Sequence, residues 1–307
     1  MKVIFMGTPD FSVGTLEALI QAGHEITMVV TQPDKPKGRG KTMHFCAVKE
    51  AALSYGLPIY QPKKIREKEC IEYLKNIEAD IIVVVAFGQI LTKEILEMPL
   101  YGCINVHASL LPKYRGAAPI QWAVINGETE TGVTTMKMDE GLDTGDMIMK
   151  TVVPVDKEET GGSLFKKLSI EGAKLCVKTL EALENKTAVY EKQNEEDFTY
   201  AKMIKKQMGR IQWTDSAVVI ERLIRGLNPW PSAFTGLNGK TLKIWKANVI
   251  EKEGMPGEVL EVTKESLIVG TGKGALAIEE LQLEGKKRMG IDTFLRGVTI
   301  EKGTKLQ

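Results

Sequence analysis

The sequence is poor in cysteine and lacks any Cys-x-x-Cys pair. Its four cysteines (Cys46, Cys70, Cys103 and Cys176) are scattered along 307 residues. Disulfide frameworks and structural zinc sites need paired cysteines, so this pattern argues against both and favours a reducing compartment. His44 and Cys46 stand two residues apart, but no second pair of ligands lies nearby in the sequence. We therefore expect no metal site.

Long hydrophobic runs are also missing. The longest, from Ile81 to Phe87, has the length of a buried strand and falls far short of a membrane span. The apolar start, Met1 to Met6, is too short for a secretory signal. These features predict a cytoplasmic protein without a membrane partner.

The chain carries no excess of either charge. Lys and Arg number 41 against 40 Asp and Glu, and 43% of the residues are apolar. Such a balance is typical of a soluble globular protein and argues against a broadly basic nucleic-acid-binding surface, although it leaves a local basic patch open. At 307 residues the chain is longer than one typical core supports, so we expect two domains.

Glycine is scarce where a dinucleotide-binding fold needs it. The turn after the first predicted strand reads Gly7-Thr8-Pro9-Asp10-Phe11-Ser12 and has a single glycine. Because the backbone must approach a pyrophosphate closely at this turn, the sequence disfavours a nicotinamide or flavin enzyme. The turn either lines a substrate cleft or merely connects strand and helix.

Strands and helices alternate through the first two thirds of the chain. We expect strands at 3–6, 26–30, 81–87, 102–106, 133–138 and 146–155, and helices at 12–22, 45–55, 66–76, 119–126 and 163–184. This order predicts a Rossmann-like, doubly wound α/β domain over residues 1–189. Residues 190–207 lack a core pattern and predict a linker. A helix and short alternating strands in 208–307 predict a small antiparallel β-barrel of the OB-like type.

Two polar residues end one of the predicted strands. Asn105 and His107 lie two apart, so their side chains share a face, and together they suit the carbonyl oxygen that becomes negative during acyl transfer. The simpler alternative is a pair of polar residues leaving a strand. An apolar loop from Ser109 to Pro112, tipped by Arg115, follows them. Further on, the acid-glycine loop 139–146 is either a turn, a calcium site or the place from which Asp143 orients His107 in its charged form.

A basic segment follows the second predicted strand. Residues 32–41 contain Lys35, Lys37, Arg39 and Lys41 among glycines and prolines. We expect a long, flexible loop, and two readings of it stand about even: a solvated surface loop, or a contact for a phosphate backbone.

These motifs resemble those of the folate-dependent formyltransferases. The resemblance rests on Asn105-x-His107, on Ser109-Leu110-Leu111-Pro112-x-Tyr114-Arg115-Gly116 and on Asp143 in Leu142-Asp143-Thr144-Gly145-Asp146. Other features resemble the members of that family that act on methionyl-tRNA: the opening 6–12, the loop 38–41, the linker, and the run from Asn228 to Phe234. The resemblance extends over nearly the whole chain.

The resemblance implies transfer of a formyl group from 10-formyltetrahydrofolate to the amino group of initiator methionyl-tRNA. In this role Asn105 would donate a hydrogen bond to the developing oxyanion, protonated His107 would add charge, and Asp143 would hold His107 and help to move the amine proton. The implied folate contacts are Ser109, Leu110, Leu111, Pro112, Phe87, Gly88 and Ile90. The implied tRNA contacts are Lys37, Arg39, Lys41, Lys206 and Arg210. We expect a monomer that needs no metal.

Three rival functions remain at this level. A formyltransferase acting on a nucleotide sugar or on glycinamide ribonucleotide would share Asn105, His107 and Asp143. It would not require the basic loop or the barrel. An RNA-binding protein without catalysis would tolerate loss of His107, and a dehydrogenase would bind a nicotinamide.

Overall fold

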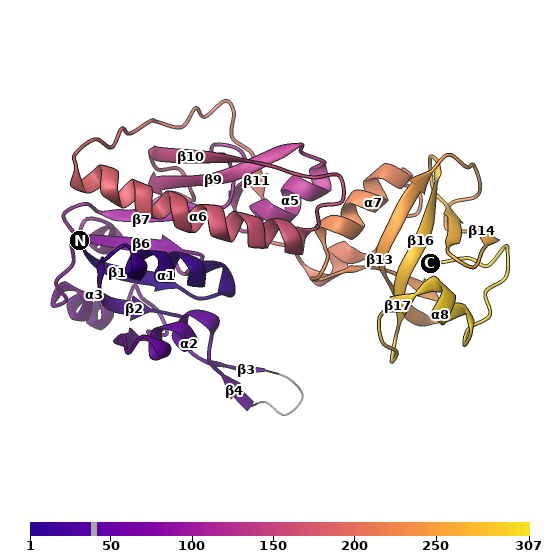
Figure 1. Cartoon of the computed structure of the whole chain (residues 1–307), viewed down its shortest axis with the longest axis horizontal. Helices are drawn as coiled ribbons and strands as arrows, with labels where there is room; N and C mark the ends of the chain where they lie inside the picture. The colour runs from indigo at the N-terminus through magenta and orange to yellow at the C-terminus, as the bar shows by residue number, and fades with distance from the viewer. Residues whose placement is uncertain (38–41) are drawn as a thin grey trace. The chain divides into compact units, whose positions relative to one another are not determined.

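The computed structural model describes residues 1–37 and 42–307. Within them the chain divides into two compact units, one of residues 1–116, 130–154 and 165–201, the other of residues 117–129, 155–164 and 202–307 (Figure 1). The predicted domains, 1–189 and 208–307, are consecutive blocks of sequence. The compact units instead interleave, because two short segments from the first block group with the C-terminal residues.

The first unit is built on a mixed sheet. Its strands are β1 (Lys2–Gly7), β2 (Glu25–Val30), β5 (Ile59–Tyr60), β6 (Ile81–Val85), β7 (Cys103–His107), β9 (Glu130–Lys137) and β10 (Met147–Pro154). They lie in the order β10-β9-β7-β6-β1-β2-β5 (Figure 1). The five strands from β5 to β7 are parallel, whereas β9 and β10 are antiparallel to their neighbours. The predicted α/β fold is confirmed, with an antiparallel edge that the sequence did not reveal.

Helices cover both faces of this sheet. They are α1 (Val13–Gln21), α2 (Ala47–Ser54), α3 (Lys68–Lys75), α4 (Lys93–Leu96) and α6 (Gly161–Glu184), with a 3-10 turn η1 (Asp10–Ser12) before α1. The turn η1 before α1 meets α6 through the rings of Phe11 and Phe165, whose centroids are 5.2 Å apart. On the other face, apolar residues of β1 and β6 pack with Leu74 of α3 and Ile95 of α4. No helix among the described residues is long and apolar enough to cross a membrane.

The alternation of side chains in β7 decides where its polar residues point. A Cβ placed on Gly172 of α6 would lie 3.1 Å from Cγ1 of Val106, so Val106 faces α6 across a close approach. Neighbouring residues of a strand point to opposite faces. Asn105 and His107 therefore point to the face that α6 does not cover.

The basic segment is more ordered than predicted. Residues Lys35–Lys37 (β3) and Thr42–His44 (β4) pair as a two-stranded antiparallel ribbon, so the prediction of a flexible loop over 32–41 is wrong for its first part. Backbone hydrogen bonds hold such a ribbon whatever the side chains, and the polar composition hid it. Lys37 lies in β3, while Arg39 and Lys41 lie outside the described residues.

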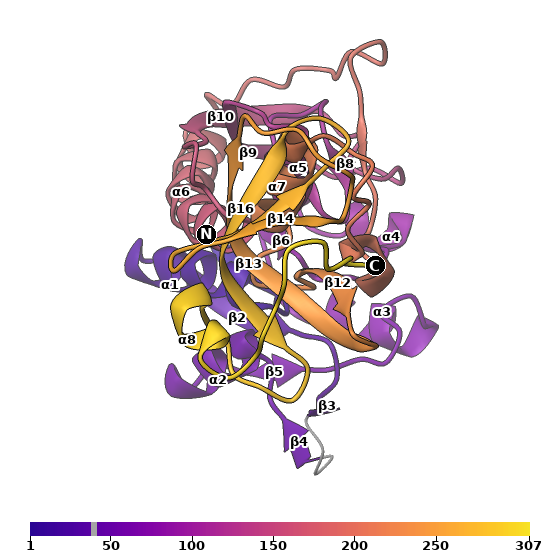
Figure 2. The same ribbon diagram turned by 90° about the vertical axis from the view of Figure 1, so that its right-hand side faces the viewer.

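The second unit combines helices with an antiparallel sheet. Its elements are α5 (Pro119–Asn126), η2 (Lys206–Gly209), α7 (Ala217–Gly226), β12 (Ala233–Leu237), β13 (Lys240–Ile250), β14 (Val259–Val262), β15 (Leu267–Gly270), β16 (Ala275–Leu283), β17 (Met289–Gly290) and α8 (Ile291–Leu295). The strands follow the order β12-β13-β16-β15-β14, and β17 pairs with β16. Figure 2 labels β12, β13, β16 and β14 of this sheet. The predicted antiparallel C-terminal β domain is confirmed.

The last residues of the chain close this sheet. Gln307 exchanges backbone hydrogen bonds with Gly236 of β12. Thr304 accepts a hydrogen bond of 2.8 Å from the backbone of Val259 in β14, and Leu306 donates one of 2.8 Å to Gly257. The C-terminal segment thus bridges the two edge strands and completes a barrel-like arrangement around a buried apolar core.

Candidate active site

Three polar side chains that are separated in sequence meet on the face of β7 that α6 does not cover. The Asn105 amide donates a hydrogen bond of 3.3 Å from Nδ2 to Oδ1 of Asp143. Nδ1 of His107 lies 3.6 Å from the other carboxylate oxygen, Oδ2. The structure therefore brings together all three residues that the sequence predicted as catalytic.

Asp143 reaches this place by a loop that folds back over the sheet. Because β9 is antiparallel to β7, with Lys137 opposite Ile104, the loop 138–146 starts beside the beginning of β7. Asp143 has a φ of +57°, a left-handed conformation that few residues other than glycine adopt. Its Oδ2 accepts a hydrogen bond of 2.8 Å from the backbone N–H of Gly116, which fixes the carboxylate.

His107 is almost enclosed by protein. Its side chain is 6% exposed, and Nε2 lies 2.9 Å from the carbonyl oxygen of Tyr114. A carbonyl only accepts, so Nε2 carries a hydrogen. With the Asp143 carboxylate facing Nδ1, both ring nitrogens face oxygen acceptors, which is the arrangement that a positively charged imidazolium needs.

The loop after β7 is held by a buried threonine of β9. Oγ1 of Thr134 donates to the carbonyl of Ser109 at 2.7 Å and accepts from the backbone N–H of Leu111 at 3.1 Å. The Ser109 hydroxyl donates to the carbonyl of Lys113, and Leu111 packs in a small cluster with two methionines. Of the predicted folate contacts in this loop, Ser109 and Leu111 are thus buried, whereas Leu110 and Pro112 are half-buried.

The remaining predicted folate contacts follow β6. Since β6 and β7 are parallel neighbours, residues 86–90 lie at the same edge of the sheet as the end of β7. The Phe87 side chain is 1% exposed and belongs to the core, and its carbonyl accepts hydrogen bonds from Thr8 and Gln32. Gly88 has a φ of +78°, and Ile90 is 81% exposed. Ile90 therefore offers apolar surface, and Phe87 offers mainly packing.

Arg115, which tips the loop after β7, is a buried structural cation. It is 1% exposed, its Nε donates to Oε1 of Gln193 at 2.9 Å, and its terminal nitrogens bind the Glu195 carboxylate. The ring of Phe198 lies 5.1 Å from the guanidinium carbon. Segment 190–201 is therefore tied to the site, and the short strands β8 (Arg115–Gly116) and β11 (Tyr200–Ala201) pair in parallel. Sequence composition gave no sign of these contacts.

The ion pair of Arg115 predicts a pH-dependent stability. The hydrogen bond from Arg115 lowers the pKa of Glu195 below its usual 4.5. A carboxyl with a lowered folded-state pKa contributes stability above its unfolded pKa and loses that contribution as pH falls through the folded value. We expect Glu195→Gln to lower the urea midpoint at pH 7, and the difference from wild type to shrink once pH falls below 4.5 and to disappear below the lowered pKa of Glu195.

The exposed neighbour Glu196 provides the matched control, because the Glu196→Gln variant changes the same group one residue away. Its urea midpoint should follow that of the wild type at every pH. A Glu195→Gln difference that persists unchanged down to the acid limit of the folded protein contradicts the ion-pair interpretation.

The basic residues of the second unit differ in their surroundings. Lys206 in η2 and Arg210 just after it are exposed. Lys246 of β13 is paired with Glu279 at 2.9 Å, and Lys243 lies over the ring of Trp245. Lys206 and Arg210 are thus the better placed of these cations to meet a phosphate.

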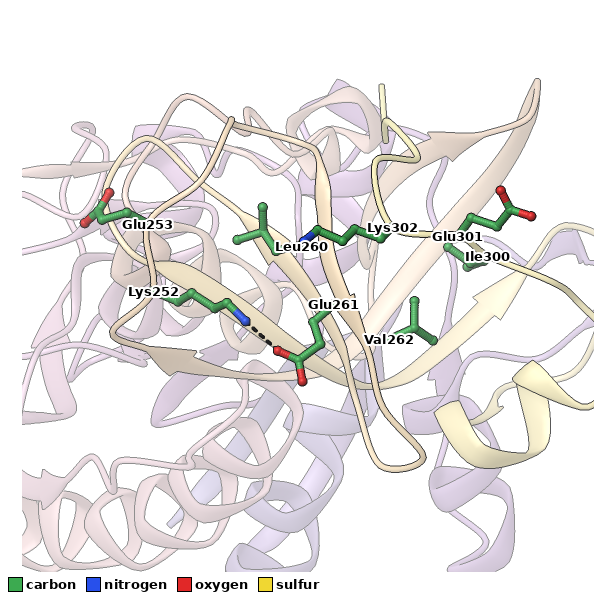
Figure 3. A pocket seen from close by; sticks show the side chains of 8 residues that line it. All are labelled: Lys252, Glu253, Leu260, Glu261, Val262, Ile300, Glu301 and Lys302. Atoms are coloured by element: carbon green, nitrogen blue, oxygen red, sulfur yellow. Dashed lines mark hydrogen bonds and ion pairs between the residues drawn. The ribbon is translucent and has the colours of Figure 1, made fainter.

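A pocket of about 610 Å³ lies in the second unit (Figure 3). It is lined by Lys252, Glu253, Leu260, Glu261, Val262, Ile300, Glu301 and Lys302. Glutamates outnumber lysines there, and Lys252 already pairs with Glu261, so the pocket suits neither a phosphate nor the glutamate tail of a folate. It contains none of the predicted site residues.

The acid-glycine loop behaves as a turn. Oδ1 of Asp139 accepts hydrogen bonds from the backbone of Gly141 and from the hydroxyl of Thr144. Within residues 1–37 and 42–307, no group of three or more His, Cys, Asp or Glu side chains is placed to hold a metal ion.

Comparison with known proteins shows the family of the chain. Residues 1–180 match the family model of the formyl transferases, and residues 203–299 match that of the formyl transferase C-terminal domain. The chain belongs to the formyl transferase family. It is 65% identical over 306 residues to the methionyl-tRNA formyltransferase of Agathobacter rectalis, and the match covers 99% of both chains.

Solved structures share the fold of this chain at low sequence identity. WlaRD, a sugar 3N-formyl transferase crystallised with dTDP and 5-N-formyl-THF, superposes with a TM-score of 0.68 at 21% identity, covering 94% of this chain and 99% of that one. HypX from Aquifex aeolicus, in complex with tetrahydrofolic acid, gives a TM-score of 0.66 at 19% identity. That match covers 99% of this formyl transferase and 50% of the HypX chain.

Proposed function

We propose that this enzyme transfers the formyl group of 10-formyltetrahydrofolate to the free amino group of initiator methionyl-tRNA. The observation that carries the proposal is the cluster in which one carboxylate, Asp143, holds both Asn105 and His107. The cluster stands in a chain whose similarity to a methionyl-tRNA formyltransferase extends over 99% of its length. The product is the formylated initiator that starts protein synthesis.

The chain's own residues provide a site for acyl transfer. The folate supplies the activated formyl group when it is bound. Asn105 donates an amide N–H to the formyl oxygen as negative charge develops on it, and charged His107 adds electrostatic stabilisation. Both ring nitrogens of His107 face protein oxygens. To contact the formyl oxygen directly, His107 therefore exchanges its hydrogen bond to Tyr114 for one to the substrate. Asp143 keeps both groups in place and takes part in removing the amine proton, directly or through water.

The residues around the cluster fit a folate. A pteridine ring needs apolar surface beside a few convergent polar groups. Ile90 is 81% exposed at the edge where β6 ends, and Leu142 is 60% exposed beside Asp143. Leu110 and Pro112 add half-buried apolar surface from the loop after β7. Ser109, Leu111, Phe87 and Gly88 shape this wall through their backbone and packing.

The second part of the proposal concerns the RNA. Residues 1–189 carry the chemistry. Residues 190–207 connect the two domains and contribute Lys206 to the tRNA contacts, and residues 208–307 form the tRNA-binding domain. Lys206 and Arg210 meet its phosphates, as do Lys37, Arg39 and Lys41 of the basic segment. Such contacts make binding strongly dependent on salt even for a chain of net charge +1. We infer that the enzyme acts as a monomer in the cytosol, where initiator tRNA is charged.

An acceptor comparison tests the function. Formyl transfer from 10-formyltetrahydrofolate should be measured with methionyl-tRNA, with a dTDP-amino sugar and with glycinamide ribonucleotide as acceptors. We expect rapid formylation of methionyl-tRNA and no more than background with the two small molecules. The affinity for methionyl-tRNA should also weaken steeply as salt is raised. Preference for either small acceptor would replace the proposed substrate while leaving the chemistry in place.

A further inference from the structure

One buried amide joins three segments at the active site. Gln193 is 9% exposed, and its Nε2 donates two hydrogen bonds of 2.8 Å, one to the carbonyl of Asp143 and one to that of Gly145. Its Oε1 accepts from Nε of Arg115 at 2.9 Å. Every hydrogen-bonding atom of this side chain is thus used within the site.

The contacts of Gln193 converge on the Asp143 carboxylate from two sides. The first side is the main chain of Asp143 itself, whose carbonyl the amide holds. The second runs through Arg115, because the next residue, Gly116, donates its backbone N–H to Oδ2 of Asp143. Asp143 has a positive φ, so its conformation needs such support from outside the loop.

We propose that Gln193 is a positioning residue for the formyl-transfer reaction: it fixes the Asp143 loop so that the carboxylate can hold Asn105 and His107. The inference rests on the proposed function. Gln193 itself contacts neither substrate nor the reacting atoms. It acts through Asp143, and a carboxylate misplaced by about 1 Å costs on the order of a hundredfold in rate.

The variant Gln193→Glu tests this role with almost no change in shape. It keeps the oxygen that accepts from Arg115. The amide nitrogen that donates to the carbonyls of Asp143 and Gly145 is replaced by a second oxygen, which repels both carbonyls when the carboxyl is ionised. We expect kcat to fall by about tenfold to a hundredfold, with unchanged KM for methionyl-tRNA and for the folate. When the new carboxyl is protonated it donates again, so the ratio of variant to wild-type kcat should rise as pH is lowered.

A matched control makes the same chemical change elsewhere. Gln282 of β16 also donates from Nε2 to a carbonyl, that of Lys286, at 2.9 Å. Gln282→Glu should leave kcat and its pH profile as in the wild type. A purely structural role for Gln193 predicts a lower thermal midpoint for Gln193→Glu with wild-type kcat at every pH, and that result overturns the proposal.

A second variant keeps the test decisive if Gln193→Glu does not fold. Gln193→Met preserves the length of the side chain without a charge and removes both donors, so it should lower kcat without restoring it at low pH. Wild-type kcat in a folded Gln193→Met enzyme also overturns the positioning role. Formylation by the wild type, measured in the same assay, separates the two questions: its absence rejects the proposed function and not the role of Gln193.

Discussion

Replacing Asn105 or His107 by alanine is expected to lower kcat for formyl transfer by about a hundredfold or more. Each substitution removes a group that stabilises the negative charge on the formyl oxygen, and this charge is present chiefly in the transition state. The KM for methionyl-tRNA should change little, because neither residue is among the proposed tRNA contacts. Single-turnover formylation with enzyme in excess measures the chemical step directly.

The interpretation of these variants depends on controls for folding. Asn105 also bonds Asp143, so thermal midpoints of both variants should be compared with the wild type. Asn76→Ala removes an exposed amide that donates to the carbonyl of Glu72 in α3, and it should keep wild-type kcat. A non-catalytic RNA-binding protein would show no functional loss on His107→Ala. Full turnover in either Asn105→Ala or His107→Ala therefore rejects the mechanism.

The central cluster was predictable because the information is local. A spacing of two in a strand puts Asn105 and His107 on one face whatever the rest of the fold does. Asp143 belongs to a loop whose residues resemble those of known formyltransferases. The direction of β9 was not predictable, since a hydrophobic pattern reports which face of a strand is buried and carries no sign of its direction. Consequently the way in which the loop folds back to Asp143 became visible only in the structure.

The support around the cluster left no trace in the sequence. Gln193 binds the carbonyls of Asp143 and Gly145 across 50 and 48 residues, and a carbonyl is present at every position. Segment 190–207 was predicted as a linker because the contacts of Gln193 and Glu195 are hydrogen bonds and an ion pair, which need no apolar period. The closing segment 304–307 is likewise too short for periodicity to be recognised. Hydrophobic periodicity therefore does not reveal polar and backbone contacts between residues that are far apart in the sequence.

The loop that carries Asp143 also depends on Gly145, at a position where no side chain fits. A Cβ on Gly145 would stand 1.7 Å from the carbonyl oxygen of Lys137, which is backbone and cannot move aside alone. The loop approaches β9 so closely because the Lys137 N–H donates a hydrogen bond of 2.8 Å to the carbonyl of Asp146. Any larger residue at position 145 must push the loop away from β9.

Gly145→Ala should therefore damage both stability and catalysis. We expect the free energy of unfolding to fall by about 1–3 kcal/mol or more, as for overpacked interiors. The displaced Asp143 should lower kcat by about a hundredfold. Gly14→Ala in α1 adds the same methyl group 3.6 Å from the Ser169 hydroxyl, an ordinary contact, and should raise stability by up to about 1 kcal/mol with kcat unchanged. Urea unfolding and steady-state formylation should be measured for both variants. If Gly145→Ala and Gly14→Ala have the same stability and kcat, the loop does not need its close approach to Lys137. Asp143 would then be placed by Gln193 and Gly116 alone.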